Sequence, residues 1–486
     1  MSHSAVQRLT QTRAVTSAIL LTARNVFTHT VVPAHGSIGP LTRIAGLTLF
    51  QRCLLTLQRC GLSQVFILSG DEAESLKAVL AEGPAITMGI RWIPVREFPP
   101  EDPRTWETLA ADATGACVVV GPQVAFSRGL IETLRGMGQV DDLVVVLRDE
   151  DRSRSSAGPQ DRGNLRKHES LMRLAGIVRA GAAKPSHVAG VASEVVLVPA
   201  GGFVKGSALA ELLLTRGRED QAGDTPMARL VEAAAADGRV SVVEARAGST
   251  TWAREVHEAG DAKCVERALY GSLKSNFEGV VDKYLNRRLS PLFTKIFLAL
   301  KMTPNAITVL ATMIGLIGAV CFAQGSYVAG LLGALLFQWS AVIDCCDGEV
   351  ARLTFAESPF GAKLDLWLDN LVHVAIFAGL AYGAYHHSPA GLDPRLVLWG
   401  GVAAVAANVV SFFSVTRLTV RQHDGARSPW VDFLLKNVAT RDFSLIVLVC
   451  AVIGQLPWFL MVAAAGSALF ALVTLVLLFF VRPTRE

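Results

Sequence analysis

The sequence predicts a two-part protein, an α/β domain followed by an all-α domain of six transmembrane helices. The chain has 486 residues, and 51% of them are hydrophobic. Residues 1–300 carry frequent charges and alternate short apolar runs with amphipathic stretches, whereas long apolar runs dominate over 306–481. A chain of this length has room for two or three domains.

The first part alternates strand-like and helix-like segments. The apolar runs that indicate strands are 15–21, 64–69, 116–120, 194–198 and 240–244. An amphipathic pattern over 47–60 predicts a helix between the first two. This alternation favours a Rossmann-like, mostly parallel sheet that is covered on both faces and closes near residue 250. The charged segment 148–168 is expected to be a mobile loop within the domain.

The second part is expected to cross a membrane six times, because a helix of about 20 apolar residues spans the hydrocarbon core. The expected spans are 306–323, 326–346, 363–386, 394–416, 442–456 and 458–481. We therefore divide the chain into a soluble domain over 1–258, an amphipathic connector over 259–303 that lies along the membrane surface, and a membrane domain over 304–486.

Lysine and arginine predict the orientation. The segment before the first span and the loops 352–363 and 417–441 carry most of the positive charge, and the opposite turns carry almost none. Because positively charged loops stay in the cytoplasm, we expect a multi-pass protein of the cytoplasmic membrane with both termini and the soluble domain in the cytoplasm.

Composition narrows the choice of partners. The net charge of +4 provides no basic footprint for nucleic acid. The eight cysteines have no zinc-type spacing, so we expect free thiols.

Four aspartates at fixed spacing are the main functional signal. Asp344, Asp347, Asp365 and Asp369 lie at the expected cytoplasmic ends of the second and third spans. A charged residue at the centre of a membrane helix costs about 2.5–3.5 kcal/mol on insertion scales, so four of them need a strong reason. Spacings of three and four residues place each pair on one helix face. Two such carboxylate stripes repel each other unless cations lie between them.

Hard divalent cations such as Mg²⁺ or Mn²⁺ would explain the pattern, because they take oxygen ligands and bind phosphates in the same coordination sphere. The small residues Gly348, Ala351 and Gly361 would let a bulky ligand approach the backbone, and Arg352 supplies a fixed positive charge. These residues favour metal-assisted phosphoryl or phosphodiester chemistry at the membrane face. A transporter whose carboxylates bind protons or ions is the alternative.

The stretch from Asp344 to Asp369 resembles the signature of the CDP-alcohol phosphotransferase (CDP-alcohol phosphatidyltransferase) family. That signature is Asp-x₂-Asp-Gly-x₂-Ala-Arg-x₈-Gly-x₃-Asp-x₃-Asp, and the chain matches it at every fixed position. The resemblance covers about residues 270–485. It extends to a Pro-Asn-x-Ile-Thr run at 304–308 and an Arg-Asp-Phe run at 441–443.

The resemblance implies a role for each matching residue. Asp344, Asp347 and Asp365 would ligate two Mg²⁺ or Mn²⁺ ions, and Asp369, also close to metal, would be the general base for an acceptor hydroxyl. The residues implied to hold the CDP-alcohol are Asp344, Asp347, Gly348, Ala351, Arg352, Gly361, Asn305 and Thr308. The hydroxyl would attack the phosphorus attached to the donor alcohol, and CMP would leave. The resemblance also implies a homodimer.

The first domain resembles a sugar-phosphate nucleotidyltransferase that has lost its catalytic groups. The helix start at 44–52 and the strand at 60–70 fit that family, but the first strand lacks the glycine loop that follows it there. Pro122-Gln123 and Arg254 stand where two metal-binding aspartates are expected. Losing both carboxylates predicts a non-catalytic domain that stabilises the membrane dimer or gates the active site.

We therefore expect an integral-membrane, metal-dependent CDP-alcohol phosphotransferase of phospholipid biosynthesis. The donor would be CDP-diacylglycerol or a related CDP-lipid drawn from the membrane lipids, and the acceptor a polar alcohol or a polyol phosphate such as inositol phosphate. The arginines expected to hold an acceptor phosphate are Arg287, Arg288, Arg417, Arg421 and Arg441.

Two alternatives stay open. The domain order resembles bifunctional inositol-phosphate cytidylyltransferase and di-myo-inositol-phosphate-phosphate synthase proteins, which would use CDP-inositol and inositol phosphate. A regulatory, nucleotide-sensing membrane protein is the alternative from another class, although the intact aspartates argue against it.

Overall fold

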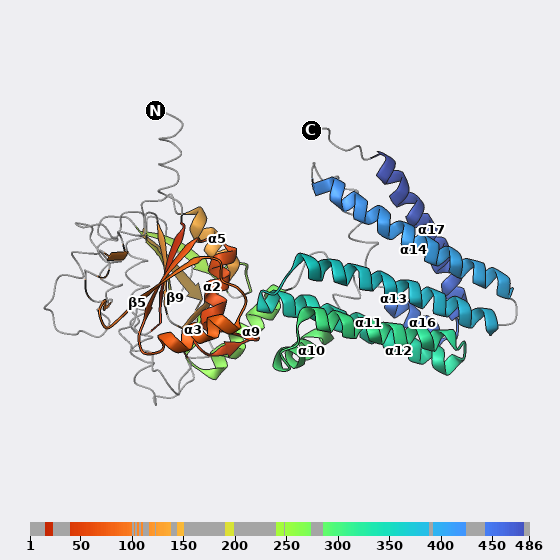
Figure 1. The fold of residues 1–486 in the computed structure, drawn as a ribbon, viewed down its shortest axis with the longest axis horizontal. Coiled ribbons are helices and arrows are strands. Elements are labelled where there is room, and N and C mark those ends of the chain that lie inside the picture. The colour runs from red at the N-terminus through yellow and green to blue at the C-terminus, as the bar shows by residue number, and fades with distance from the viewer. Residues whose placement is uncertain are drawn as a thin grey trace. The chain divides into compact units, whose positions relative to one another are not determined.

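The chain folds into two compact units, Met1–Ser272 and Leu273–Glu486 (Figure 1). The boundary between them falls inside the segment that was expected to be a connector. The residues described in this computed structural model are 15–22, 39–99, 102, 105, 108–109, 116–121, 123–137, 143–149, 190–198, 240–246, 248–273, 285–387, 392–423 and 443–480. Of the loop expected over 148–168, residues 148 and 149 end a strand instead, and 150–168 lie outside the described residues, as does the segment 23–38 after the first strand.

A seven-stranded sheet in the order β10-β8-β9-β6-β1-β4-β5 forms the centre of the first unit. Its strands are β1 (Ser17–Leu21), β4 (Gln64–Ser69), β5 (Gly89–Pro94), β6 (Cys117–Val120), β8 (Leu143–Asp149), β9 (Gly190–Val198) and β10 (Val240–Ala245). Strand β1 pairs in parallel with β4 and β6. Strand β9 runs antiparallel to both β6 and β8, so the sheet is mixed. The predicted α/β class is confirmed.

Shorter elements complete this unit. They are β2 (Arg43–Ile44), β3 (Leu47–Thr48), α2 (Leu49–Arg59), α3 (Ala73–Glu82), β7 (Val124–Phe126), α5 (Arg128–Gly136), β11 (Ala253–Glu255) and α9 (Ala259–Ser272). Helix α2 begins at a capping box in which the side chain of Thr48 accepts from the backbone N–H of Gln51 and the side chain of Gln51 accepts from that of Thr48. The Gln51 amide also donates to the carbonyl of Val79, 2.8 Å away, and so ties α2 to α3.

The central strands are buried on both faces, which explains their nearly continuous runs of valine, isoleucine and leucine. All eight cysteines are free thiols, as expected. Burial raises the pKa of the Cys53 and Cys117 thiols to about 12, so both stay protonated and unreactive at neutral pH.

The second unit is helical throughout its described residues. Its helices are α10 (Arg287–Ala299), α11 (Pro304–Ala323), α12 (Tyr327–Thr354), α13 (Pro359–His386), α14 (Pro394–His423), α16 (Phe443–Val452) and α17 (Leu456–Phe480). Five helices in the described part of the chain are long and apolar enough to cross a membrane, where six spans were predicted. The fifth expected span is represented by the apolar but shorter α16, which has 10 residues, and the residues before it, 424–442, lie outside the description.

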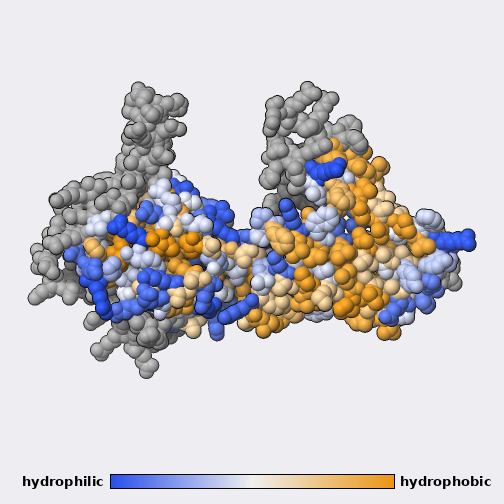
Figure 2. Space-filling model, in the orientation of Figure 1, coloured by the Kyte–Doolittle hydropathy of each residue, from blue (hydrophilic) through white to orange (hydrophobic). Residues whose placement is uncertain are grey.

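Exposed apolar side chains mark the second unit as a membrane domain. Among the described residues, every large hydrophobic side chain that is exposed belongs to this unit except Leu41. The apolar surface dominates the visible face of these helices in Figure 2. Side chains such as Val328 (74% exposed) and Val462 (71% exposed) are stable in contact with lipid but unfavourable in water.

Helix α11 is the packing centre of this unit, because both α12 and α13 lie along it. Helix α13 approaches α11 most closely at Gly379 and Gly383. A Cβ atom at Gly379 would lie 2.3 Å from the carbonyl oxygen of Ala319, and one at Gly383 would lie 2.1 Å from that of Phe322. Small residues at such crossings let membrane helices pack backbone to backbone.

We predict that Gly379→Ala destabilises the helical unit, because the new methyl group must push α13 away from the α11 backbone. Overpacking of this kind costs about 1–3 kcal/mol, so the apparent Tm in detergent should fall by several degrees. The matched control is Gly466→Ala in α17, where a Cβ atom meets nothing within 4 Å; its Tm should stay unchanged or rise slightly. Equal Tm values for the two variants would contradict the packing at Gly379.

Candidate active site

The turn between α12 and α13 brings the two aspartate pairs together. Helix α12 ends where Phe355 adopts a left-handed conformation with φ 59°. Helix α13 begins at Pro359, and the Ser358 side chain caps it by accepting from the backbone N–H of Gly361 at 2.9 Å. Asp344 and Asp369 each lie ten residues from the helix end nearest this turn. At a rise of about 1.5 Å per residue, both carboxylates therefore sit about 15 Å from the turn, at the same level.

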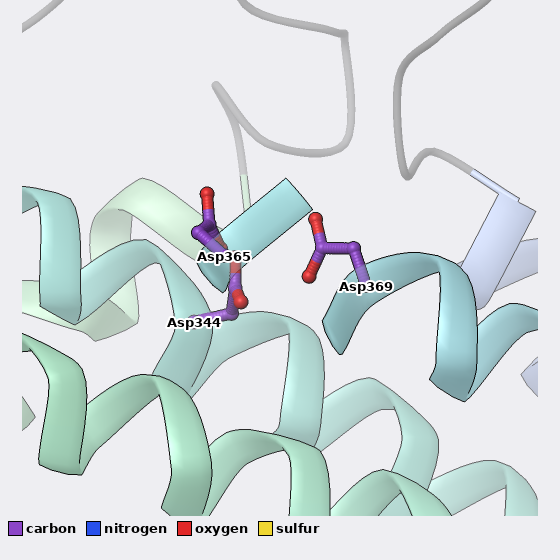
Figure 3. A group of neighbouring side chains, drawn as sticks. All are labelled: Asp344, Asp365 and Asp369. Atoms are coloured by element: carbon purple, nitrogen blue, oxygen red, sulfur yellow. The ribbon is translucent and has the colours of Figure 1, made fainter. Parts of the chain in front are cut away.

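Three carboxylates converge at this level. Oxygen atoms of Asp344 on α12 and of Asp365 and Asp369 on α13 all lie within 4.8 Å of one another, and all three residues are half-buried (Figure 3). Helices α12 and α13 each pack along α11 but make little direct backbone contact with each other. The carboxylates therefore face one another across the space that α11 keeps open between the two helices.

This donor set fits a hard divalent cation. All three ligand atoms are carboxylate oxygens, which Mg²⁺ and Mn²⁺ prefer over nitrogen and sulfur donors. Three carboxylates leave further positions of an octahedral ion for phosphate oxygens and water. The arrangement is thus able to hold a cation and to present it to a phosphate group.

The fourth aspartate of the motif has a different environment. Asp347 is 8% exposed and is not a member of the three-carboxylate cluster. One of its oxygens accepts a hydrogen bond from the Thr308 hydroxyl on α11. In the same first turns of α11, Asn305 lies against Gly361 of α13, where a Cβ atom would be only 2.9 Å from the Asn305 side-chain oxygen. The run at 304–308 therefore contacts both halves of the motif.

The small residues of the motif leave room for polar neighbours. A Cβ atom at Gly348 would lie 3.3 Å from a guanidinium nitrogen of Arg352, one helical turn away. The guanidinium thus lies over the bare backbone of Gly348. Ala351 and Arg352 are both half-buried.

The arginines that were suggested to hold an acceptor phosphate differ in their exposure and in their partners. Arg287 is 17% exposed in its side chain and pairs with Glu349 at 3.2 Å. Arg288 and Arg417 are exposed. Arg421 belongs to α14, but its side chain is outside the described part of the chain, as is all of Arg441.

Glu349 is a buried acid that the sequence analysis missed. It occupies a variable position of the motif, and its side chain is 3% exposed. Its carboxylate accepts hydrogen bonds from Arg287, Ser290 and Thr294, all on α10. The signal that would have found it is a carboxylate on the face of α12 opposite the aspartates, together with hydroxyl residues spaced along one face of α10.

The first unit brings Gln123 and Arg254, the two residues singled out in the sequence, close to a pair of short strands. Strands β7 and β11 pair antiparallel, and the backbone of Val256 donates to that of Gln123. An amide and a guanidinium, Gln123 and Arg254, take the place of the carboxylates, and the Gln123 oxygen lies 3.2 Å from Nδ1 of His257. The neighbouring Glu255 is buried at 3% exposure, so it does not face solvent.

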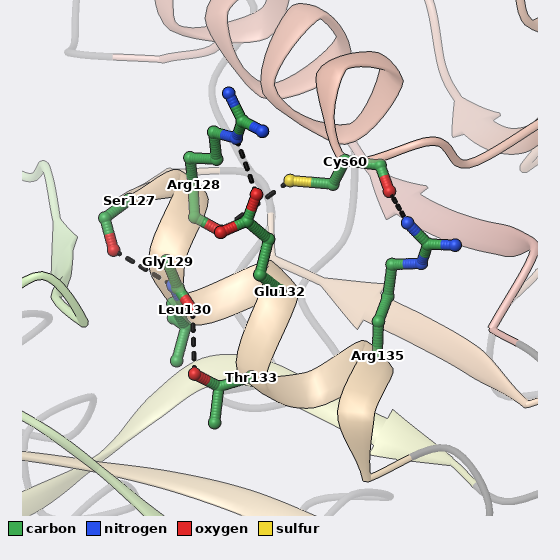
Figure 4. A network of polar contacts seen from close by, with 8 residues as sticks. All are labelled: Cys60, Ser127, Arg128, Gly129, Leu130, Glu132, Thr133 and Arg135. Atoms are coloured by element: carbon green, nitrogen blue, oxygen red, sulfur yellow. Dashed lines mark hydrogen bonds and ion pairs between the residues drawn. The ribbon is translucent and has the colours of Figure 1, made fainter. Parts of the chain in front are cut away.

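Helix α5 fixes the end of this small sheet (Figure 4). The Ser127 hydroxyl caps the helix by accepting from the backbone of Leu130, and it also accepts from the backbone of Trp252 just before β11. At the other end, Arg135 donates to the carbonyl of Cys60. These contacts belong to the scaffold and add no catalytic group.

The comparison with known families agrees with the geometry of the second unit. Residues 301–481 match the family model described as CDP-alcohol phosphatidyltransferase. The matched range contains all four aspartates and every helix from α12 to α17. This part of the helical unit is therefore similar to CDP-alcohol phosphatidyltransferase domains.

Two curated relatives show what kinds of protein the chain is similar to. The chain is 37% identical over 120 residues to a bifunctional IPC transferase and DIPP synthase from Aquifex aeolicus, an alignment that covers 24% of this chain and 27% of the relative. It is 33% identical over 128 residues to a phosphatidylinositol phosphate synthase from Mycolicibacterium smegmatis, covering 26% of this chain and 54% of that protein. Each alignment spans less than two thirds of the relative's own length.

Among solved structures, the phosphatidylinositol phosphate synthase of Mycobacterium tuberculosis with CDP-DAG bound matches 40% of this chain and 94% of its own. The identity is 21% and the TM-score is 0.30.

We predict that the purified protein binds Mn²⁺ and that Asp365→Asn weakens this binding by at least about tenfold, since a neutral amide replaces one of three charged ligands. Titration of the free Mn²⁺ signal by electron paramagnetic resonance measures the Kd. The matched control is Asp393→Asn, an exposed carboxylate at the start of α14 that is outside the cluster. Unchanged affinity in Asp365→Asn would contradict a metal site at these aspartates.

Proposed function

We propose that the protein is an integral-membrane, metal-dependent CDP-alcohol phosphotransferase. It transfers a phospho-alcohol group from a CDP-alcohol to a polar alcohol and releases CMP. The observation that carries this proposal is the convergence of Asp344, Asp365 and Asp369 in the family-matched unit. Such a cluster is costly beside apolar helices unless it binds cations, and cations at a phosphate are what this transfer requires.

We assign the proton transfer to Asp369. Its carboxylate accepts the proton of the acceptor hydroxyl while the hydroxyl oxygen forms a bond to the phosphorus attached to the donor alcohol. The bond from that phosphorus to the oxygen bridging it to the CMP phosphate breaks, and CMP departs with the bonding electron pair. The proposed metal ligands are Asp344, Asp347, Asp365 and Asp369, and Mg²⁺ or Mn²⁺ bound there, two ions per site, would supply positive charge to offset the charge developing on the phosphates.

The remaining motif residues hold the donor. Arg352 offers a guanidinium beside the uncovered backbone of Gly348, suited to a diphosphate oxygen. Asn305, Thr308, Ala351 and Gly361 complete the proposed CDP-alcohol site. Asp347 contributes from its hydrogen bond with Thr308, which orients it before the donor arrives.

CDP-diacylglycerol or a related CDP-lipid is the preferred donor, because exposed apolar side chains surround the helices and a lipid donor reaches the site from the bilayer. An inositol phosphate is the preferred acceptor, since one matched relative is named a phosphatidylinositol phosphate synthase. The exposed Arg288 and Arg417 are the described candidates to hold its phosphate. Arg287 is less suited, because Glu349 already neutralises it.

A second function is favoured by a specific observation. Relatives named bifunctional IPC transferase and DIPP synthase match this chain at 31–37% identity in three of the alignments. In this alternative the donor is CDP-inositol and the acceptor inositol phosphate. The same carboxylates would serve, because only the group attached to the transferred phosphorus differs.

The first unit is proposed to be non-catalytic. Gln123 and Arg254 provide no carboxylate at the positions where a nucleotidyltransferase holds metal, and a positive guanidinium there would repel it. We propose that this unit lies in the cytoplasm with both termini, as the lysine and arginine distribution predicts, and that it stabilises a homodimer of the membrane domain or gates its active site.

We predict that the protein in detergent with Mn²⁺ releases CMP from CDP-diacylglycerol only when inositol phosphate is added. A parallel reaction with CDP-inositol as the donor decides between the two functions, and polyols without phosphate test the need for the acceptor phosphate.

In a further reaction with CTP and inositol phosphate, the full chain should release no pyrophosphate. Pyrophosphate release would contradict a non-catalytic first unit, and no CMP from any pair would favour a regulatory protein.

We predict that Asp369→Asn lowers the kcat for CMP release by at least about 10³-fold, because an amide cannot take the proton of the hydroxyl. Binding of the CDP-alcohol, measured by calorimetry, should stay within about threefold of wild type. Asp344→Asn should weaken both turnover and metal-dependent binding. Normal turnover in Asp369→Asn would refute its role as the base.

A further inference from the structure

The carboxylate of Glu349 is almost fully buried, and its described hydrogen-bond partners all lie on α10. Its Oε1 accepts from the Ser290 hydroxyl at 2.6 Å and from Arg287 at 3.2 Å, and its Oε2 accepts from the Thr294 hydroxyl at 2.7 Å. The three donors recur at intervals of three and four residues, so they form one face of α10. Both oxygens of the acid are therefore committed to a single neighbouring helix.

Glu349 and the aspartates occupy opposite sides of α12. Successive residues of a helix are about 100° apart, so Glu349 lies about 140° around the axis from Asp344 and about 160° from Asp347. Asp347 is bonded to Thr308 on α11. Two buried carboxylates therefore hold α12 on opposite sides. That of Asp347 is hydrogen-bonded to α11, and that of Glu349 is hydrogen-bonded to α10.

These two hydrogen-bonded contacts set the rotation of α12 about its axis. A carboxylate oxygen lies roughly 6 Å from the axis of its helix, so a rotation of about 10° moves it by about 1 Å. A misplacement of about 1 Å is able to cost about 10²-fold in rate. The distance of Asp344 from Asp365 and Asp369 on α13 therefore depends on how firmly α12 is held.

We propose that Glu349 is a positioning residue that fixes the rotation of α12 through α10 and so keeps Asp344 in register with the two aspartates of α13. This inference rests on the proposed function, but its first readout is metal binding. The residue touches neither substrate nor metal in this role. It acts through the helix that carries both itself and Asp344.

The chemistry of the contact suits this task. A carboxylate accepts from all three donors at once, whereas a glutamine amide offers one accepting oxygen and turns an N–H₂ group towards donors. The guanidinium of Arg287 lies 3.2 Å from the Glu349 carboxylate and offsets its charge. An apolar residue would leave two hydroxyls and a guanidinium without this acceptor.

The test compares Glu349→Gln with wild type by Mn²⁺ titration and by the kcat for CMP release at saturating Mn²⁺. We expect the Kd for Mn²⁺ to rise about tenfold and kcat to fall 10- to 100-fold in protein that elutes as a folded species. The matched control is Tyr327→Phe, which removes a hydrogen bond to the carbonyl of Val452 at the far end of α12. It should leave both quantities within about twofold of wild type.

A milder variant keeps the inference testable if Glu349→Gln fails to fold. Thr294→Val removes one of the three donors with little change of shape, and we expect about a threefold rise in the Kd for Mn²⁺. In the double variant the combined effect should be smaller than the product of the single effects, because both changes remove the same hydrogen bond.

The outcomes are separable. A purely structural role for Glu349 predicts a lower Tm with wild-type Kd and kcat in the folded variants, and that result overturns the inference. If wild type binds Mn²⁺ but releases no CMP, the proposed function fails while the change in Kd still decides the role of Glu349. If wild type binds no Mn²⁺, both fail together.

Discussion

Electrostatic repulsion among three carboxylates is the constraint on which the helical unit depends. Two unit charges 4.8 Å apart repel by about 3 kcal/mol at an effective dielectric constant of about 20, and the cluster contains three such pairs. Packing must hold these groups together before a cation arrives. Helix α11 does so by packing against both α12 and α13 while the two make little direct contact. A pre-formed cluster binds a cation without a further entropic cost for ordering its ligands.

Several buried polar contacts around the cluster join separate segments of the helical unit. Thr308 joins α11 to α12 through Asp347, and Gln338 of α12 bonds both Asn286, just before α10, and Ser444 of α16. In a membrane the hydrophobic effect contributes little to helix association, so hydrogen bonds and close packing decide the register. The polar residues of this unit therefore fix the positions of the helices as well as supplying the candidate catalytic groups.

Sequence patterns predicted the α/β class, the helical membrane domain and two facing aspartate stripes, because apolar runs and spacings of three and four residues follow directly from backbone geometry. Three of the four predicted aspartates lie together. They did not predict that Asp347 turns to Thr308, nor that Glu349 bonds to α10, because side-chain partners on separate helices depend on helix rotation. The antiparallel β9 was missed for a similar reason, since a buried apolar run is the same in either direction. The expected connector over 259–303 stays a prediction, and the boundary between the two compact units falls within it.

The two units differ in which of the expected carboxylates they contain. The helical unit keeps every motif carboxylate, whereas the first unit keeps a sheet and replaces the expected aspartates with Gln123 and Arg254. Chemistry is thus assigned to one unit only. The most direct measurement is anomalous diffraction at the manganese edge from crystals grown with Mn²⁺. We expect anomalous density between Asp344, Asp365 and Asp369; density confined to other parts of the molecule, or none at these carboxylates, would contradict the metal centre.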